Sequence, residues 1–281
     1  MVVLKALLAA IGLYVVFVVV WTLACFSLTV AARYREVASE DRRPIMLGAA
    51  VAAVLGEIVN TIRLHLTVVL LALFRRRPRG GILYLDAAKT PVLLVPGYGR
   101  FAGCWGPMKR MLRRRGAGPV FELAPGIVFA PIEEFARRLA ARVDAILQAT
   151  GATQIDLVGH SMGGLVVRYY IEKLGGAQKV RKCITLETPH HGTLLALLAP
   201  GQNGRQMRPG SPFLTELNEM ESSPHLPQIV SIWSPFDNMT IPPTSSILGG
   251  TARNVRVDHM PHYTALFSPR IADIIVHELN R

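Results

Sequence analysis

The chain has 281 residues, of which 51% are hydrophobic, and a formal net charge of +12. Its positive mean hydropathy of +0.33 excludes a largely disordered chain, because disordered segments are poor in apolar residues, and its length excludes a lone small module. The basic charge is not accompanied by a zinc-finger, basic-zipper or RNA-recognition signature, so we expect no nucleic-acid partner.

The first predicted element is an uncharged, apolar segment over residues 6–32. As an α-helix it would be about 40 Å long, which is enough to cross a hydrocarbon core of about 30 Å. A cleaved signal peptide is the alternative, but its apolar region is shorter, about 7–15 residues, and this segment carries Trp21 near its middle. We therefore expect a retained transmembrane anchor.

A second apolar segment covers residues 45–74 and contains Glu57, Arg63 and His65. These side chains would be costly in contact with lipid, so whether this segment spans the membrane stays open. Glu57, Thr61 and His65 share one helical face. The simplest interpretation of that face is a contact with the first helix. A helix lying in the membrane interface is the other interpretation, and a functional relay would need a partner that the sequence does not identify.

A basic cluster of Arg75, Arg76, Arg77 and Arg79 follows the second segment. This position fits a juxtamembrane contact with anionic lipid headgroups. The basic residues between the two segments nearly balance the cluster, so the positive-inside rule does not orient the anchor. We expect a membrane-anchor region over residues 1–80, with helices at about 6–32 and 45–74, and the membrane as a partner.

From residue 81 onwards, short apolar runs alternate with longer amphipathic segments. This alternation is typical of βαβ units and of a mostly parallel sheet with helices on both faces. Residues 81–281 are therefore predicted to form one α/β domain. The expected strands are residues 91–95, 120–123, 155–158, 183–186, 229–233 and 255–257. The clearest expected helix begins at Pro131. A second helix is expected at the C-terminus, over residues 271–279.

The sequence Gly159-His160-Ser161-Met162-Gly163 follows one predicted strand and leads into an apolar helix. A Gly-x-Ser-x-Gly pattern in this setting is typical of a tight turn that raises a serine hydroxyl above the sheet, beside a helix N-terminus. Such a serine becomes a nucleophile when a histidine takes its proton and an acid orients the histidine. We interpret Ser161 as a candidate nucleophile. A glycine-rich turn without catalysis is the alternative.

Candidates for the acid and the base lie downstream of this serine. Asp237 follows the strand predicted at residues 229–233, where a loop at the carboxyl end of a strand would carry an acid. His259, His262 and His277 come after it. His277 lies in the predicted C-terminal helix and is interpreted as a surface residue. We favour His262, which follows the last predicted strand by a short loop, and keep His259 as an alternative base.

An oxyanion that forms during acyl transfer is stabilised by backbone N–H groups aimed at it. The amide of Met162, directly after the candidate nucleophile, is one expected donor. The loop Pro96-Gly97-Tyr98-Gly99 after the first predicted strand supplies the second, with Tyr98 as the expected donor. An ordinary Pro-Gly turn is the alternative interpretation of this loop.

These motifs resemble those of bacterial lipases and esterases of the α/β-hydrolase superfamily, in a subgroup with an N-terminal membrane anchor. The similarity covers about residues 90–275. The motifs that carry it are residues 92–98, 159–164, 188–193 and 206–211, Asp237-Asn238, and residues 262–269. The resemblance implies an α/β-hydrolase fold preceded by one or two transmembrane helices, and a location in the bacterial inner membrane.

The resemblance further implies a serine hydrolase that cleaves carboxylic esters, with Ser161 as nucleophile, His262 as base and Asp237 as orienting acid. It assigns the oxyanion hole to the amides of Tyr98 and Met162. An anchor favours lipid-like ester substrates. Acyl transfer by the same residues and a non-catalytic, membrane-anchored binding protein are the alternatives. No cofactor is expected, and neither the acyl-chain length nor the oligomeric state follows from the sequence.

The chain departs from many bacterial lipases at Pro96-Gly97, where they have His-Gly, but the backbone donor stays available. Some related lipases hold calcium near the catalytic histidine; this sequence offers no convincing carboxylate pair, so no metal is expected. His190 and His191 are adjacent and point in different directions, which argues against a zinc site. Residues 193–224 occupy the place of a lid in relatives and are interpreted either as a lid or as ordinary helix and loop.

Two further sets of residues have simple interpretations. Four aromatic residues are expected either to line an acyl pocket or to belong to the core: Tyr98, Phe101, Trp105 and Phe129. Three cysteines show neither metal-ligand spacing nor a clear pairing and are interpreted as structural: Cys25, Cys104 and Cys183.

Overall fold

The computed structural model describes residues 2–36, 47–73, 89–99, 103–124, 126–219 and 226–281. Three expectations lie outside the described residues: the basic cluster Arg75, Arg76, Arg77 and Arg79, the place of Phe101, and the domain boundary at residues 80–81.

A six-stranded sheet forms the centre of the second part of the chain, in the order β2-β1-β3-β4-β5-β6, and each neighbouring pair is parallel. The strands are β1 Val92–Val95, β2 Val120–Glu122, β3 Ile155–His160, β4 Val180–Leu186, β5 Ile229–Trp233 and β6 Arg253–Arg256. The structure confirms all six predicted strands; β5 has the predicted bounds, and the other five differ from the prediction at one end or both. β3 continues beyond the predicted end to His160, so it runs directly into the candidate nucleophile.

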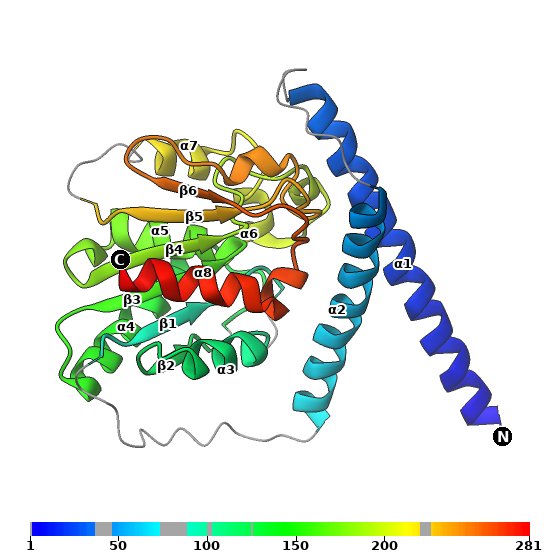
Figure 1. The fold of residues 1–281 in the computed structure, drawn as a ribbon, viewed down its shortest axis with the longest axis horizontal. Helices are drawn as coiled ribbons and strands as arrows, with labels where there is room; N and C mark the ends of the chain where they lie inside the picture. Colours follow the sequence, from blue (N-terminus) through cyan, green and yellow to red (C-terminus); the bar gives the residue numbers. More distant parts are fainter. Residues whose placement is uncertain (1, 37–46, 74–88, 100–102, 125, 220–225) are drawn as a thin grey trace.

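Helices cover both faces of this sheet, as predicted (Figure 1). They are α3 Gly106–Arg114 and α8 Pro269–Asn280 on one face, and α4 Ile132–Thr150 and α5 Met162–Lys173 on the other. Side chains of β1 alternate between the two faces of the sheet, because successive residues of a strand point to opposite faces. Leu93 and Val95 pack with α4 and α5, whereas Val92 and Leu94 pack with α3 and α8.

Shorter elements complete the domain. They are α6 Gly201–Gln206, α7 Pro212–Asn218, and the 3₁₀ turns η2 Gly176–Gln178, η3 Leu194–Leu197, η4 Pro243–Ser246 and η5 Thr264–Phe267. The segment that was expected to be a lid or ordinary helix and loop contains η3, α6 and α7. Its last residues, 220–224, lie outside the described residues.

The strand order reverses direction between β1 and β3. The chain passes from β1 to β2 on one side of the sheet and then returns to β3 on the other side of β1. Loops that leave two such strands diverge, and they open a crevice at the carboxyl ends of the strands. The loops after β1 and β3 are those with the predicted oxyanion donor Tyr98 and the predicted nucleophile Ser161.

The start of α5 packs directly on the end of β1. A Cβ atom at Gly163 would lie 2.3 Å from the carbonyl oxygen of Val95 and 2.7 Å from that of Pro96. Both obstacles are backbone atoms, so this contact is possible only for glycine. It holds the first turn of α5 against the loop that follows β1.

Helices α1 Val2–Glu36 and α2 Leu47–Leu73 pack against each other, on the side to which the strands' carboxyl ends point (Figure 1). Both are long and apolar enough to cross a membrane. The hydroxyl of Tyr14 lies 2.6 Å from Nδ1 of His65, which confirms the expected helix–helix contact for that residue. The expectation is wrong for Glu57, whose carboxylate contacts the backbone of Tyr263 and Thr264 in the α/β domain.

Gly163→Ala tests the contact between α5 and β1. The added methyl group overlaps backbone atoms, so we expect the free energy of unfolding to fall by about 1–3 kcal/mol and the Tm by several degrees. Gly106→Ala, at the start of α3, is the matched control, because a Cβ atom there meets nothing within 4 Å. Thermal unfolding in detergent measures the Tm of wild type and of the two variants. A Tm of Gly163→Ala equal to that of wild type would contradict the packing argument.

Candidate active site

Ser161 occupies the turn between β3 and α5 with φ 57° and ψ −131°. A positive φ is strained for a residue with a side chain, and this strain is typical of the sharp turn that presents a nucleophile. The backbone fixes the turn from both directions: Ser161 N donates to Leu186 O at 2.9 Å, and Gly164 N donates to Ser161 O at 3.0 Å. The predicted strand–turn–helix setting of Ser161 is therefore present.

The loop after β1 lies against this turn. A Cβ atom at Gly97 would lie 2.9 Å from Cβ of Ser161, so the loop backbone passes within contact of the serine. Tyr98 lines the same cavity as Ser161, and its hydroxyl donates to Pro200 O at 2.7 Å. Met162 is the first residue of α5, where the N–H groups have no partner within the helix.

Asp237 and His262 are in direct contact. Nδ1 of His262 lies 3.0 Å from Oδ1 and 3.1 Å from Oδ2 of Asp237, and both side chains are buried. The amide of His262 also donates to Oδ1 of Asn238 at 3.2 Å. His259 is instead exposed, with its ring against Phe236, and His277 is exposed on α8. Of the three candidate histidines, His262 is the one that contacts the predicted acid.

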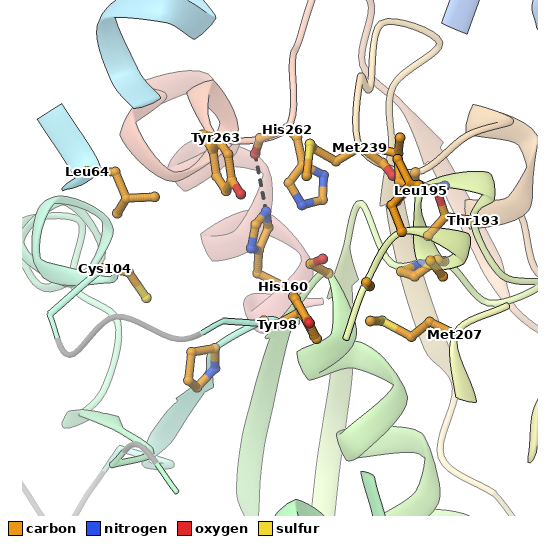
Figure 2. Close-up of a pocket in the computed structure, with 18 of the residues that line it drawn as sticks. Leu64, Tyr98, Cys104, His160, Thr193, Leu195, Met207, Met239, His262 and Tyr263 are labelled. Atoms are coloured by element: carbon orange, nitrogen blue, oxygen red, sulfur yellow. Dashed lines mark hydrogen bonds between the residues drawn. The ribbon is translucent and has the colours of Figure 1, made fainter. Parts of the chain in front are cut away.

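A cavity of about 260 Å³ lies at the carboxyl ends of the strands, and both Ser161 and His262 line it. Figure 2 shows the apolar side chains Leu64, Leu195 and Met207 around it, with His262 at its wall. Within the described part of the chain, no hydrogen bond joins the hydroxyl of Ser161 to the ring of His262. The structure thus brings the predicted acid and base together and places the predicted nucleophile on the same cavity.

The two N-terminal helices form part of the cavity wall. Trp21 of α1 and Leu64 of α2 are among the residues that line it. Of the expected aromatic residues, Tyr98 lines the cavity, Trp105 is fully buried in the core, and Phe129 is exposed beside Tyr98. The sequence did not predict a contribution from the helices, because nothing in an apolar helix marks which side chains face a distant pocket.

His160 supports the backbone at the candidate base. Its Nε2 lies 3.2 Å from the carbonyl oxygen of His262 (Figure 2), and the two rings are 4.5 Å apart. Burial lowers the pKa of His160 well below its ordinary value, and the nearby His262 adds to that shift. His160 is therefore neutral at pH 7 and serves as a hydrogen-bonding group.

Glu187 is a second buried carboxyl group beside His262. It follows β4, has φ 50°, and places Oε2 at 3.4 Å from Nδ1 of His262. That oxygen has no hydrogen-bond partner among the residues that the structure describes. Burial, and then the charge of Asp237, raise the pKa of Glu187 well above its ordinary value. Sequence reasoning missed this residue, although an acid directly after β4, at the same sheet edge as Asp237, was a usable signal.

The charge state of His262 depends on these acids. Burial by itself lowers the pKa of His262, but the charge and hydrogen bonds of Asp237, followed by the neighbouring Glu187, outweigh burial and raise the pKa above its ordinary value of 6.5. Asp237 is the nearer of the two acids to Nδ1 of His262, at 3.0 Å against 3.4 Å for Glu187. The amides of Met239 and Thr240 donate to Oδ1 of Asp237 at 2.8 Å and 3.0 Å and hold its side chain in place.

His160, Glu187 and His262 are the one group among the described residues that could offer three ligands to a metal ion. Two of these side chains already have hydrogen-bond partners: Nδ1 of His262 contacts Asp237, and Nε2 of His160 contacts the carbonyl oxygen of His262. The expectation that no metal is bound stays a prediction.

His190 and His191 contact different partners, as the sequence suggested. His190 is buried with its Nε2 3.0 Å from Oγ1 of Thr185, whereas Nε2 of His191 lies 3.0 Å from the carbonyl oxygen of Ile247. The three cysteines named above are buried and form no disulfide with one another, which agrees with their structural interpretation.

Comparison with known sequences places these features in a family context. Residues 124–216 match a family described as "alpha/beta hydrolase fold". Two triacylglycerol lipases, from Pseudarthrobacter phenanthrenivorans and Burkholderia plantarii, are each 44% identical to this chain over 59 residues, which is 21% of this chain. The matches cover 18% and 16% of those two lipases, so the chain matches less than a fifth of their length.

Solved structures share the fold over most of the chain. Lipase B from Aspergillus fumigatus has a TM-score of 0.63 and 20% identity, over 73% of this chain and 56% of that one. The mature lipase BlEst2 from Bacillus licheniformis has a TM-score of 0.60 and 18% identity, over 70% of this chain and 94% of that one. This chain has the α/β-hydrolase fold, carries two apolar N-terminal helices compatible with an anchor, and resembles bacterial lipases and esterases.

Proposed function

We propose that this protein is a membrane-anchored serine hydrolase that cleaves carboxylic esters with an apolar acyl group. The observation that carries the proposal is the buried contact between Asp237 and His262 at 3.0 Å, on a mostly apolar cavity that Ser161 also lines. The similarity of this chain to triacylglycerol lipases supports ester hydrolysis. The mostly apolar lining of the cavity supports an apolar substrate.

In the proposed reaction, neutral His262 takes the proton of Ser161 as Oγ attacks the ester carbonyl carbon. The amides of Tyr98 and Met162 stabilise the resulting oxyanion. His262 then gives its proton to the leaving alcohol as the ester C–O bond breaks, which leaves an acyl group on Ser161. Water attacks the acyl carbon while His262 takes its proton; the bond from that carbon to Oγ of Ser161 then breaks, His262 returns the proton to Oγ, and the carboxylic acid is released. Asp237 keeps the ring of His262 oriented and stabilises its charged form.

The N-terminal region is proposed to be a retained membrane anchor over residues 1–80, with the catalytic domain over residues 81–281. Cys25 of α1 is buried against the catalytic domain, beside Leu195 and Ile241. Oγ1 of Thr29 donates to the carbonyl oxygen of Asp237 at 3.0 Å. Removing α1 as a signal peptide would uncover these contacts, which supports retention.

Ser161→Ala tests the nucleophile. With p-nitrophenyl esters of increasing chain length and detergent-solubilised full-length protein, we expect hydrolysis to fall by more than about a thousandfold and labelling by a fluorophosphonate to disappear. Ser27→Ala is the control, because Ser27 is an exposed serine on α1. Wild-type protein that neither hydrolyses the esters nor reacts with the probe would refute the hydrolase proposal and favour a binding protein.

The pH dependence tests the base. The reaction needs neutral His262, whose pKa is raised above 6.5, so kcat/KM should increase with pH along a limb whose midpoint lies above that value. Asp237→Asn removes the charge that raises this pKa, so the midpoint should fall and kcat should drop by more than about a hundredfold. Glu187→Gln should move the midpoint less, because Oε2 of Glu187 lies 3.4 Å from Nδ1 of His262, farther than Oδ1 of Asp237 at 3.0 Å. A wild-type midpoint at or below 6.5 would contradict this assignment.

Retention of α1 is tested on protein expressed with its own N-terminus. Intact mass measurement of the membrane fraction should show the full chain of 30.8 kDa, which alkaline carbonate does not extract. A shortened protein that lacks the first segment, or a protein released by carbonate, would be evidence for a cleaved signal or a peripheral protein.

A further inference from the structure

Glu57 is a buried carboxyl group on a largely apolar helix. Its side chain is 0% exposed, and it lies near the middle of α2. A buried carboxylate is destabilising unless hydrogen-bond donors or cations compensate it. No basic side chain forms an ion pair with it within the ranges that the structure describes, so its donors have to be hydrogen-bonding groups.

Those donors come from the segment that directly follows His262. Oε1 of Glu57 accepts from the amide of Tyr263 at 2.9 Å, and Oε2 accepts from both the amide and the hydroxyl of Thr264, each at 2.9 Å. Thr264 begins the turn η5, where backbone N–H groups lack partners within the turn. The carboxylate of Glu57 therefore caps η5 from a helix about 200 residues away in the sequence.

Neighbouring positions on α2 strengthen this contact. Nδ2 of Asn60 donates to Oγ1 of Thr264 at 3.2 Å, and the guanidinium of Arg63 lies over the ring of Phe267, 4.7 Å from its centre. Residues at spacings of three share one side of a helix. Residues 57–63 of α2 thus contact η5 from its start at Thr264 to its end at Phe267.

The contact completes the support of the candidate base. The His262 amide is held by Asn238, its ring by Asp237, and its carbonyl oxygen by His160. Glu57 holds the two amides that follow. Without Glu57, the amides of Tyr263 and Thr264 lose their only acceptors in the described structure.

We infer that Glu57 is a positioning residue for His262: by binding the amides of Tyr263 and Thr264, the second N-terminal helix fixes the catalytic histidine. This inference rests on the proposed function of His262 as the base. It assigns α2 a role in catalysis as well as in anchoring, since displacement of a base by about 1 Å can lower a rate by about a hundredfold.

The test uses the full-length protein in detergent and the variants Glu57→Ala, Glu57→Gln and Leu55→Ala. Leu55 lies on the exposed side of α2, with 58% of its surface accessible, and provides the control. With a short-chain p-nitrophenyl ester, Glu57→Ala should lower kcat by at least about tenfold and leave KM within about twofold. Glu57→Gln keeps one acceptor oxygen and should recover part of the lost kcat. The rate of Ser161 labelling by a fluorophosphonate should follow the same order.

A folded Glu57→Ala protein with kcat within twofold of wild type would overturn the inference. If Glu57→Ala does not accumulate as folded protein, Glu57→Gln decides: a kcat equal to that of wild type overturns the inference, and a decrease of about threefold or more supports it. A loss that appears equally in Leu55→Ala would reflect general damage to α2 and would also count against it.

Hydrogen–deuterium exchange separates this inference from the proposed function. Amides of Tyr263 and Thr264 that lose their acceptor should exchange faster in both Glu57 variants than in wild type and Leu55→Ala. This readout needs no catalytic activity. If wild type hydrolyses no ester, the proposed function fails, and unchanged exchange in the Glu57 variants shows separately that Glu57 does not hold this segment.

Discussion

The close packing of α5 on the end of β1 is the contact on which the site depends. The absence of a side chain at Gly163 lets the first turn of α5 touch the carbonyl oxygens of Val95 and Pro96. This contact sets the Ser161 turn beside the loop with Tyr98. A parallel sheet brings all its carboxyl ends to one edge, so the loops after β4 and β5 and the segment after β6 reach the same crevice.

The two carboxyl groups in this crevice differ in their supply of hydrogen-bond donors. Asp237 accepts two amides and contacts Nδ1 of His262. Glu187 lies at the same imidazole nitrogen without a donor to Oε2 among the described residues. Two adjacent buried carboxylates repel each other when both are ionised, and burial together with the charge of Asp237 raises the pKa of Glu187. The two acids are therefore not equivalent partners of His262.

Local patterns in the sequence were sufficient for the sheet, the Ser161 turn and the contact of Asp237 with His262, because each depends on strand period or on position after a strand. The end of β6 was less predictable, since Arg253, Asn254 and Arg256 are exposed on an edge strand and carry no apolar pattern. The contact of Glu57 with the segment after His262 could not be predicted. It depends on how two helices dock on a domain whose partner residues are about 200 positions away.

The geometry of the candidate site depends on how α1 and α2 pack against the α/β domain. A helix that only tethers a domain needs apolar side chains on all sides, and α1 has them at Leu13 and Phe17, which are 73% and 61% exposed. Its other side includes the buried Thr22, Cys25 and Thr29. The hydroxyl of Thr29 lies 3.0 Å from the carbonyl oxygen of Cys25 in its own helix and 3.0 Å from that of Asp237 in the α/β domain. The same surface of α1 and α2 therefore lines the cavity and contacts the segments that carry Asp237 and His262, while the apolar side chains on the outer side of both helices stay exposed.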